Sequence, residues 1–517
     1  MSKKPISEFL ALKEFSGSIK TYTSILSLLH WDQETYMPPG GITARGQQIS
    51  LLSTHIHELK TSKKYHNLLG KLIHLSSGKP KKKGLSKLDH ISLREWHKEF
   101  LRDSKLPASF VKTFSQTTSE ASQVWQTAKN TNNFKLFAPF LEKILQLNRE
   151  KAEILGYSDH PYDALLENYE PSMTSARVKE IFGKLRKELV HLLDQIRGSS
   201  QIDDRFLKGS FDPKKQFELG SAMLRKLPLE PDFSRMDLSA HPFSMALHPH
   251  DSRITTRILS DGFMSNLFSV LHEGGHSMYE MNLPTQHWGT PLAEAVSLGI
   301  HESQSRWWET LIGHSMPFWK CHYPLVQQTF PARLKKISLN QFYRAINKVT
   351  PSFIRVEADE VTYCLHVILR FEIEMALVSG QLQVSDLPYA WNEKMKELLG
   401  VVPPTDREGC LQDVHWAFGD FGYFPTYALG NLFAAQFFSA FTKEHPDWDQ
   451  RVASGDLSFI RDYLKTNIHS LGKQYSSEGL VKRLTGKPLS ETAYCHYLKT
   501  KYGEIYNIRA SRNTERG

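Results

Sequence analysis

The chain has few cysteines and no long apolar run, and each of these absences excludes a class of protein. Its four cysteines, Cys321, Cys364, Cys410 and Cys495, lie far apart and form no CxxC pair. That spacing argues against a cysteine–zinc site and a disulfide framework, and it is typical of a reducing compartment. No stretch approaches the roughly 20 apolar residues of a membrane span, and the N-terminal segment lacks the apolar region of a signal peptide. We therefore predict a cytoplasmic protein without a membrane partner.

Positively charged residues are spread along the chain, although lysines and arginines (64) outnumber aspartates and glutamates (55). Only one short segment, KPKKK at 79–83, contains several of them together. No aromatic platform or nucleic-acid motif accompanies the run, so we expect a solvated loop and no nucleic-acid partner. Binding of nucleic acid through Lys79, Lys81, Lys82 and Lys83 is the least favoured alternative.

Helical periodicity dominates the rest of the chain. Apolar residues recur at three- and four-residue spacing over 7–30, 43–75, 85–104, 109–130, 134–155, 174–197, 213–226, 262–282, 292–313, 339–349, 355–379, 385–399 and 427–444. Between 235 and 259 two prolines and the β-prone run 253–257 predict a small strand system. No long flexible linker separates these segments, which favours one continuous, mainly α-helical unit.

The segment HEGGH at 272–276 carries the chemistry. On a helix, His272 and His276 lie one turn apart on the same face and can bind one metal ion through their imidazoles. Glu273 then lies beside the metal, where a carboxylate can take a proton from water. Gly274 and Gly275 each weaken a helix by roughly 1 kcal/mol against alanine. We therefore expect another backbone, or a substrate, to approach this helix closely.

A catalytic zinc usually has three protein ligands, and the following segment offers three candidates for the third. These are Glu294, Glu302 and Glu309, and spacing alone does not choose among them. A glutamate on a following helix is the pattern of the gluzincins. The polar HESQ segment at 301–304 sits among apolar residues, and a carboxylate buried there would need a positive partner such as a metal.

Several separated motifs occur in a particular order. They are HPF at 241–243, DSRIT at 251–255, HEGGH at 272–276, HESQ at 301–304, IRVEAD at 354–359 and GCLQDVHW at 409–416. WDQETYMPPGG at 31–41, YDALLENYEP at 162–171 and GYFPTYALG at 422–430 accompany them. With these motifs the chain resembles the carboxypeptidase Taq family of zinc metallocarboxypeptidases over almost its whole length.

The resemblance implies a ligand set of His272, His276 and Glu302, with one zinc ion per subunit. Cobalt or manganese also suits two imidazoles and a carboxylate. It further implies a helical fold with a deep groove and a small sheet beside the zinc helix, commonly as a homodimer. We expect a single unit over 1–517, in which about 1–130 forms one wall of the groove.

The activity that the resemblance implies is release of the C-terminal residue from peptides with a free C-terminus. Glu273 is expected to act as general base and then as general acid. His415 and Tyr423 are candidates to donate to the developing negative charge, although either residue could simply be packed among aromatic neighbours.

A guanidinium suits a free carboxylate, and Arg253 and Arg355 are the arginines within the motifs. Each has a structural alternative, in which Arg253 pairs with Asp251 and Arg355 with Asp359. The strand around Arg253 could instead bind an extended peptide through its backbone. Asp413 is expected either to orient a histidine or to cap a helix.

Two other functions are compatible with the sequence. One is an oligopeptide-cutting metalloendopeptidase, which would share the metal and the glutamate but would not need a carboxylate clamp. The other is a non-catalytic helical scaffold with a vestigial metal site. The intact Glu273 argues against the scaffold, because a decayed site has no chemical need for it.

Overall fold

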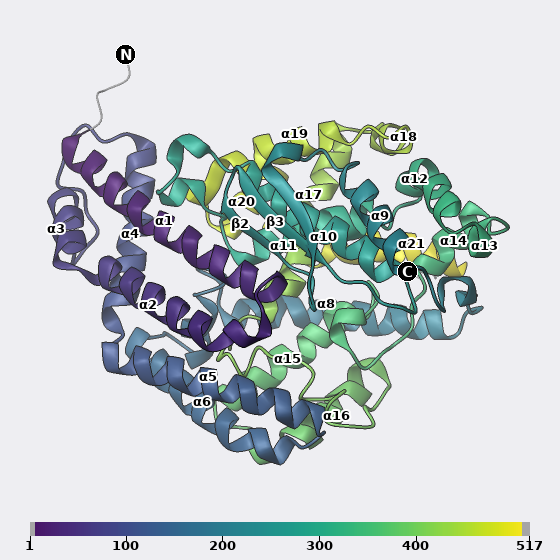
Figure 1. Cartoon of the computed structure of the whole chain (residues 1–517), viewed down its shortest axis with the longest axis horizontal. Helices are drawn as coiled ribbons and strands as arrows, with labels where there is room; N and C mark the ends of the chain where they lie inside the picture. Colours follow the sequence, from purple (N-terminus) through teal and green to yellow (C-terminus); the bar gives the residue numbers. More distant parts are fainter. Residues whose placement is uncertain (1–5, 509–517) are drawn as a thin grey trace, which may run out of the picture.

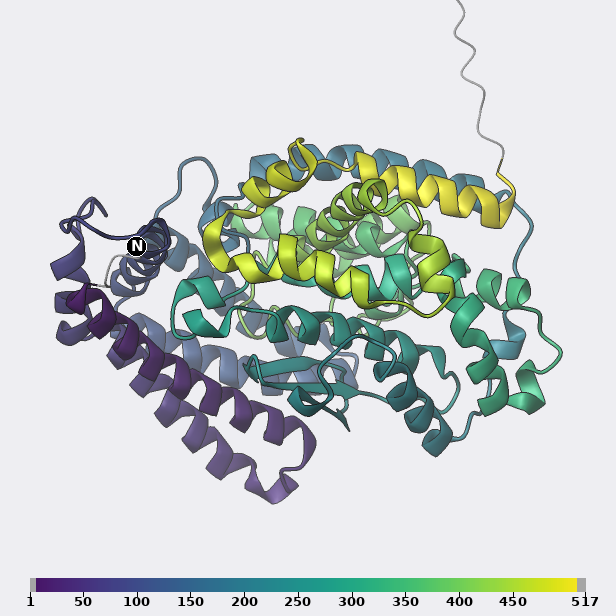
Figure 2. The same ribbon diagram turned by 90° about the horizontal axis from the view of Figure 1, so that it is seen from above.

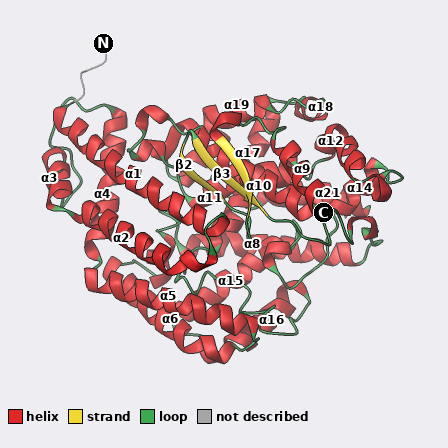
Figure 3. Cartoon of the chain, viewed as in Figure 1, coloured by secondary structure: helices red, strands yellow, loops and turns green. Residues whose placement is uncertain are grey.

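The computed structural model describes residues 6–508, which are mostly helical around one small sheet (Figures 1 and 3). The predicted mainly α-helical fold is confirmed. In chain order the helices are α1 (Ser7–Thr35), α2 (Ile42–Thr61), α3 (Lys63–Leu72), α4 (Lys87–Lys105), α5 (Ala108–Asn130), α6 (Phe134–Leu155), α7 (Pro161–Leu166), α8 (Ser175–Arg197), α9 (Pro213–Leu224), α10 (Met264–Met281), α11 (Leu298–Arg306), α12 (Met316–Thr329), α13 (Pro331–Leu334), α14 (Leu339–Ile346), α15 (Tyr363–Val378), α16 (Leu387–Leu399), α17 (Pro425–Glu444), α18 (Trp448–Ala453), α19 (Ser458–Asn467), α20 (Ser477–Thr485) and α21 (Thr492–Tyr506).

Three predicted helical segments differ most from the structure, and the others differ by up to five residues at an end. The segment 43–75 is two helices, because Ser62 is extended and its hydroxyl accepts the Tyr65 N–H at 3.1 Å, which caps α3. The segment 292–313 becomes helical only at Leu298 and continues as a π-helix, η6 (Trp307–Ile312). The segment 355–379 begins with a short 3₁₀ turn, so α15 starts at Tyr363. The lysine run at 79–83 lies between α3 and α4, as expected.

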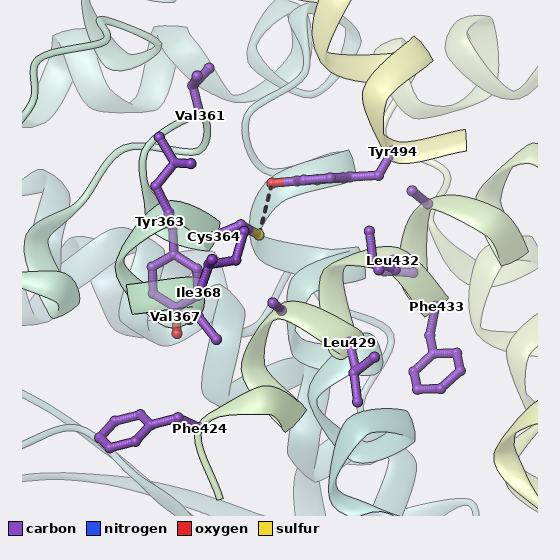
Figure 4. Close-up of a cluster of buried hydrophobic side chains, with 14 of the residues drawn as sticks. Val361, Tyr363, Cys364, Val367, Ile368, Phe424, Leu429, Leu432, Phe433 and Tyr494 are labelled. Carbon is purple, nitrogen blue, oxygen red and sulfur yellow. Dashed lines mark hydrogen bonds between the residues drawn. The ribbon is translucent and has the colours of Figure 1, made fainter. Parts of the chain in front are cut away.

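The helices pack around two hydrophobic clusters. A smaller cluster holds α1 to α4 together and includes Leu12, Leu69 and Trp96. The larger cluster begins with α5 and extends to α21. Figure 2 shows α1 and α2 as a hairpin on one side of the body. Figure 4 shows part of the larger cluster, where the Cys364 thiol lies 3.8 Å from the Tyr494 hydroxyl.

The strand system predicted at 235–259 is a three-stranded sheet. Its strands are β1 (Ser234–Leu238), β2 (Ser244–His248) and β3 (Asp251–Thr256), in the order β1–β3–β2. β3 pairs parallel with β1 and antiparallel with β2. The central strand lies on α10, where Ser252 donates to the Ser277 hydroxyl at 2.8 Å and Thr256 donates to the Asn266 amide oxygen at 2.8 Å. The sheet therefore lies beside the helix that carries HEGGH.

Among the helices between residues 6 and 508, none combines the length and the apolarity that crossing a membrane requires.

Candidate active site

Two helices bring the candidate metal ligands to one point. α10 carries His272 and His276, and α11 carries Glu302. Oε2 of Glu302 lies 3.7 Å from Nε2 of His272 and 3.4 Å from Nε2 of His276. Bonds of about 2.0–2.1 Å to a tetrahedral zinc separate two ligand atoms by about 3.3 Å. The three side chains therefore fit a divalent metal ion with little rearrangement.

Glycines allow this close approach of the helices. A Cβ atom on Gly275 would lie 2.6 Å from the backbone oxygen of Gln304 in α11. A Cβ atom on Gly430, in α17, would lie 2.5 Å from Cγ of Glu302. The expectation that another backbone approaches the glycine pair is thus confirmed at Gly275. Gly274 instead accommodates the Leu227 side chain, with which a Cβ atom on Gly274 would clash.

A second layer of charged side chains surrounds the ligands. Nδ1 of His272 lies 2.7 Å from Oε2 of Glu309, which leaves Nε2 free for a metal. Arg306 donates to Oε1 of Glu302 at 2.7 Å and to Oε2 of Glu309 at 3.1 Å. Metal-binding histidines usually donate their second N–H to such an acceptor. Glu309 is therefore placed to support the candidate ligand His272. Glu294 lies elsewhere, where its carboxylate accepts from Lys473 at 2.6 Å.

Arg306 was not predicted as a site residue, although its spacing from the glutamates indicates it. It follows Glu302 by four residues and precedes Glu309 by three, which places the three side chains on one helical face. Its guanidinium also lies over the Tyr363 ring, 4.1 Å from the ring centroid.

Burial and charge set the protonation states of the site. Burial raises the pKa of Glu273 to about 6, against the opposing charge of His272. Burial also raises the pKa of Glu302, but Arg306 and His272 outweigh it and hold this pKa well below its ordinary value. Burial lowers the pKa of His276 to about 3. A neutral imidazole and an ionised carboxylate are the forms that bind a metal.

His272 differs from His276 in its protonation. Burial lowers its pKa, but the charges of Glu302 and Glu309 outweigh this effect and raise the pKa to about 9. A cation bound at this point would displace the proton, so metal affinity must fall as the pH falls.

These side chains line a cavity of about 910 Å³, which is within the usual range for small-ligand sites. The HPF motif lines it from the sheet side, and Arg355 and Tyr423 line it as well. His415 and Arg253 are not among the residues described as lining it. Nε2 of His415 lies 3.1 Å from the hydroxyl of Tyr427, which does line the cavity.

The C-terminal helix also forms part of this cavity. Tyr494 and Tyr502 of α21 line it. Lys501 and Tyr502 both donate to one carboxylate oxygen of Glu360, at 2.6 and 2.9 Å. The cavity is therefore built from segments that lie far apart in the sequence.

Arg355 pairs with a different aspartate from the one expected. Its Nη2 and Nε lie 2.9 and 3.2 Å from Oδ1 of Asp413, and Nε of Arg370 lies 2.7 Å from Oδ2 of the same carboxylate. Asp359 instead accepts backbone N–H groups, including that of Thr362 at 3.0 Å. The alternative prediction that Arg355 pairs with Asp359 was therefore wrong. Asp413 binds two arginines where the sequence predicted a histidine or a helix end.

Arg253 pairs with Asp251, as in the structural alternative to substrate binding. Its guanidinium binds both carboxylate oxygens of Asp251, at 2.8 and 3.0 Å. It also lies 4.5 Å from the centroid of the Trp31 ring, which belongs to α1.

Comparisons with known proteins agree with the geometry. Residues 11–502 match the family described as carboxypeptidase Taq (M32) metallopeptidase. The chain is 38% identical to carboxypeptidase 1 of Bacillus subtilis over 502 residues, which covers 96% of this chain and 98% of that protein. It is 39% identical to thermostable carboxypeptidase 1 of Thermus thermophilus over 512 residues, covering 97% and 99%. The crystal structure of M32 carboxypeptidase from Deinococcus radiodurans superposes with a TM-score of 0.93 at 35% identity, covering 97% of this chain and all (100%) of that one.

Proposed function

The chain belongs to the carboxypeptidase Taq (M32) family of metallopeptidases, and from this premise we propose that it releases C-terminal residues from peptides at the His272, His276 and Glu302 centre. The metal we propose is zinc, and cobalt or manganese would also suit these donors. Held there, the ion would supply a Lewis acid that acidifies water and polarises the scissile carbonyl.

We assign proton transfer to Glu273. Its carboxyl is buried, lines the cavity and has a pKa raised by burial to about 6, close to neutral pH. A group with such a pKa takes a proton from the attacking water and returns it to the departing amine efficiently. We expect Glu273→Gln to retain the metal and lose activity by about 10²- to 10⁴-fold, measured as kcat/KM beside bound-metal analysis. Equal activity of the two proteins would contradict the assignment.

The observation that carries the exopeptidase assignment is an unbalanced positive charge at Arg355, which lines the cavity, and at Arg370 behind it. Arg355 and Arg370 are almost fully buried, with 4% and 0% exposure, and share the single carboxylate of Asp413. Burial lowers the pKa of the adjacent His415 to about 3, so this imidazole adds no charge at neutral pH. A buried charge needs a partner, and a peptide's terminal carboxylate would supply one to Arg355 beside the metal centre.

Two hydroxyl groups are suited to stabilise the developing oxyanion. Tyr423 lines the cavity, and burial raises its pKa to about 12, so it remains a donor at neutral pH. We propose Tyr423 as the direct donor. His415 would act through Tyr427, whose hydroxyl its Nε2 contacts.

The test of exopeptidase activity compares a peptide with its C-terminally amidated twin, with and without chelator, by mass spectrometry. Stepwise loss of single residues from the free peptide alone, abolished by chelation, is the expected result. Internal cleavage of both peptides would indicate an endopeptidase. Absence of cleavage by the metal-loaded protein would favour the scaffold.

A pair of matched variants tests the carboxylate clamp. Arg355→Lys should lower kcat/KM for the free peptide by about 100-fold, because a lysine cannot reproduce the paired contacts of a guanidinium. Arg253→Lys tests the other arginine of the family motifs and should keep most of the activity, because Arg253 is held by Asp251. The opposite result would move the clamp to Arg253.

We further propose one peptidase unit that forms a homodimer in a reducing compartment such as the cytoplasm. The four cysteines are free, which supports such a compartment. Light scattering of the purified protein measures its oligomeric state.

A further inference from the structure

The two candidate histidine ligands differ in what holds the ring nitrogen that faces away from the metal. Nδ1 of His272 has Glu309 at 2.7 Å. Nδ1 of His276 is buried and has no hydrogen-bond partner among residues 6–508. Metal-binding histidines almost always donate this second N–H, and the acceptor fixes the ring orientation. Another contact must therefore orient His276.

The ring of His301 makes that contact. The two imidazoles are stacked, with centroids 4.5 Å apart and an interplanar angle of 25°. Rotation of an imidazole about its last side-chain torsion has broad energy wells, so a ring without a hydrogen bond swings easily. A neighbouring flat ring restricts that rotation, because only two orientations, related by a half-turn, keep the faces in contact. In the one observed, Nε2 of His276 lies 3.4 Å from Oε2 of Glu302.

His301 is itself held by a charged side chain. Its Nε2 lies 2.9 Å from Oε1 of Glu280. Glu280 follows His276 by four residues on α10, and His301 immediately precedes Glu302 on α11. The same two helices that carry ligands thus provide a second pair of side chains behind them.

We infer that His301 is a positioning residue that orients His276 by ring stacking, and that Glu280 holds His301 in place. This role substitutes for the acceptor that His276 lacks. The inference rests on the metal centre proposed above, and it assigns no proton transfer to His301.

Two substitutions separate stacking from hydrogen bonding. His301→Phe keeps a flat ring and loses the contact with Glu280, whereas His301→Leu loses the flat ring as well. Zinc affinity is measured by competition with a chromophoric chelator, and ligand geometry by the visible absorption of the cobalt form. We expect about tenfold weaker zinc binding and an altered cobalt spectrum for His301→Leu. We expect His301→Phe to bind zinc within about threefold of the wild type.

Either of two results would overturn the inference. One is wild-type affinity and spectrum in His301→Leu. The other is equal loss in both variants, which would assign the effect to the imidazole's hydrogen bond. If His301→Leu does not fold, His301→Gln replaces it, because it removes the flat ring but keeps an N–H that can donate to Glu280, and it should weaken zinc binding in the same direction.

Controls distinguish this inference from the proposed function. His322→Leu makes the same change at another buried histidine, which packs on Phe318 at 4.4 Å, and should leave zinc affinity unchanged. His276→Ala should abolish tight binding. If the wild type binds no metal, the proposed metal centre itself is refuted. If the wild type binds metal and His301→Leu binds it equally well, only the role of His301 is refuted.

Discussion

Replacement of Glu170 by glutamine should change how the stability of the protein depends on pH. This carboxyl is completely buried, accepts the backbone N–H of Gly299 at 3.0 Å and contacts the hydroxyl of Ser477. Burial raises its pKa from 4.5 to about 7, against hydrogen bonds from Ser477, Ser297 and Gly299. A glutamine has the same shape, keeps an oxygen for Gly299 and can donate to Ser477.

The direction in which stability changes with pH follows from proton binding. Because the pKa of Glu170 is higher in the folded state, that state holds more protons between about pH 4.5 and 7. The contribution of Glu170 to the free energy of unfolding therefore falls as the pH rises through this window and is constant above it. At about 1.36 kcal/mol for each pH unit, the loss is about 3 kcal/mol. An unfolding entropy of about 2.1 cal/mol/K per residue converts this into about 3 °C of Tm for a chain of this length.

Calorimetry of both proteins at pH 5 and pH 8, at one scan rate, measures the effect. Other carboxyls also titrate, so the relevant quantity is the difference in Tm between wild type and Glu170→Gln. We expect that difference to shift by about 2 °C in favour of the variant between the two pH values, because pH 5 already lies inside the window. Parallel curves would refute the assignment of a raised pKa to Glu170.

Further substitutions test the metal centre. Glu309→Gln removes the anionic partner of His272 and should weaken metal binding by about 10- to 100-fold, measured by chelator competition; unchanged affinity would contradict a supporting role. Gly430→Ala places a Cβ atom against Glu302 and should cost about 1–3 kcal/mol of stability together with metal affinity. Gly183→Ala is its control, because a Cβ atom there meets nothing within 4 Å and should increase stability by up to about 1 kcal/mol without affecting the metal. Equal effects of the two alanines on the metal would show that close packing on Glu302 is unimportant.

Local spacing predicted the part of the site that one helix carries. His272, Glu273 and His276 share a turn of α10, and a four-residue repeat fixes their relation before any tertiary structure is known. The position of the proposed third ligand, Glu302, depends on how α11 packs against α10. Spacing therefore did not distinguish Glu302 from Glu294 and Glu309 as the third ligand, and only the resemblance to a family selected Glu302.

Ion pairs between residues far apart in the chain could not be predicted from the sequence for a similar reason. Arg355 and Asp413 are separated by 58 positions, and nothing local to either indicates the other. A nearby aspartate, Asp359, was the natural partner to predict, but its carboxylate is occupied by backbone N–H groups. The strand system was easier, because prolines and β-branched residues interrupt a helical pattern.

The place of α21 in the cavity wall has a consequence for synthesis of the protein on the ribosome. Tyr494, Lys501 and Tyr502 complete the wall around Glu360, about 200 residues after the last proposed metal ligand. At about 5–20 residues per second, translation supplies this wall some 10–40 s after Glu302 has been added. A growing chain that already contains all three proposed metal ligands would thus lack a finished substrate cavity. The order of synthesis itself would delay peptidase activity until α21 has been made.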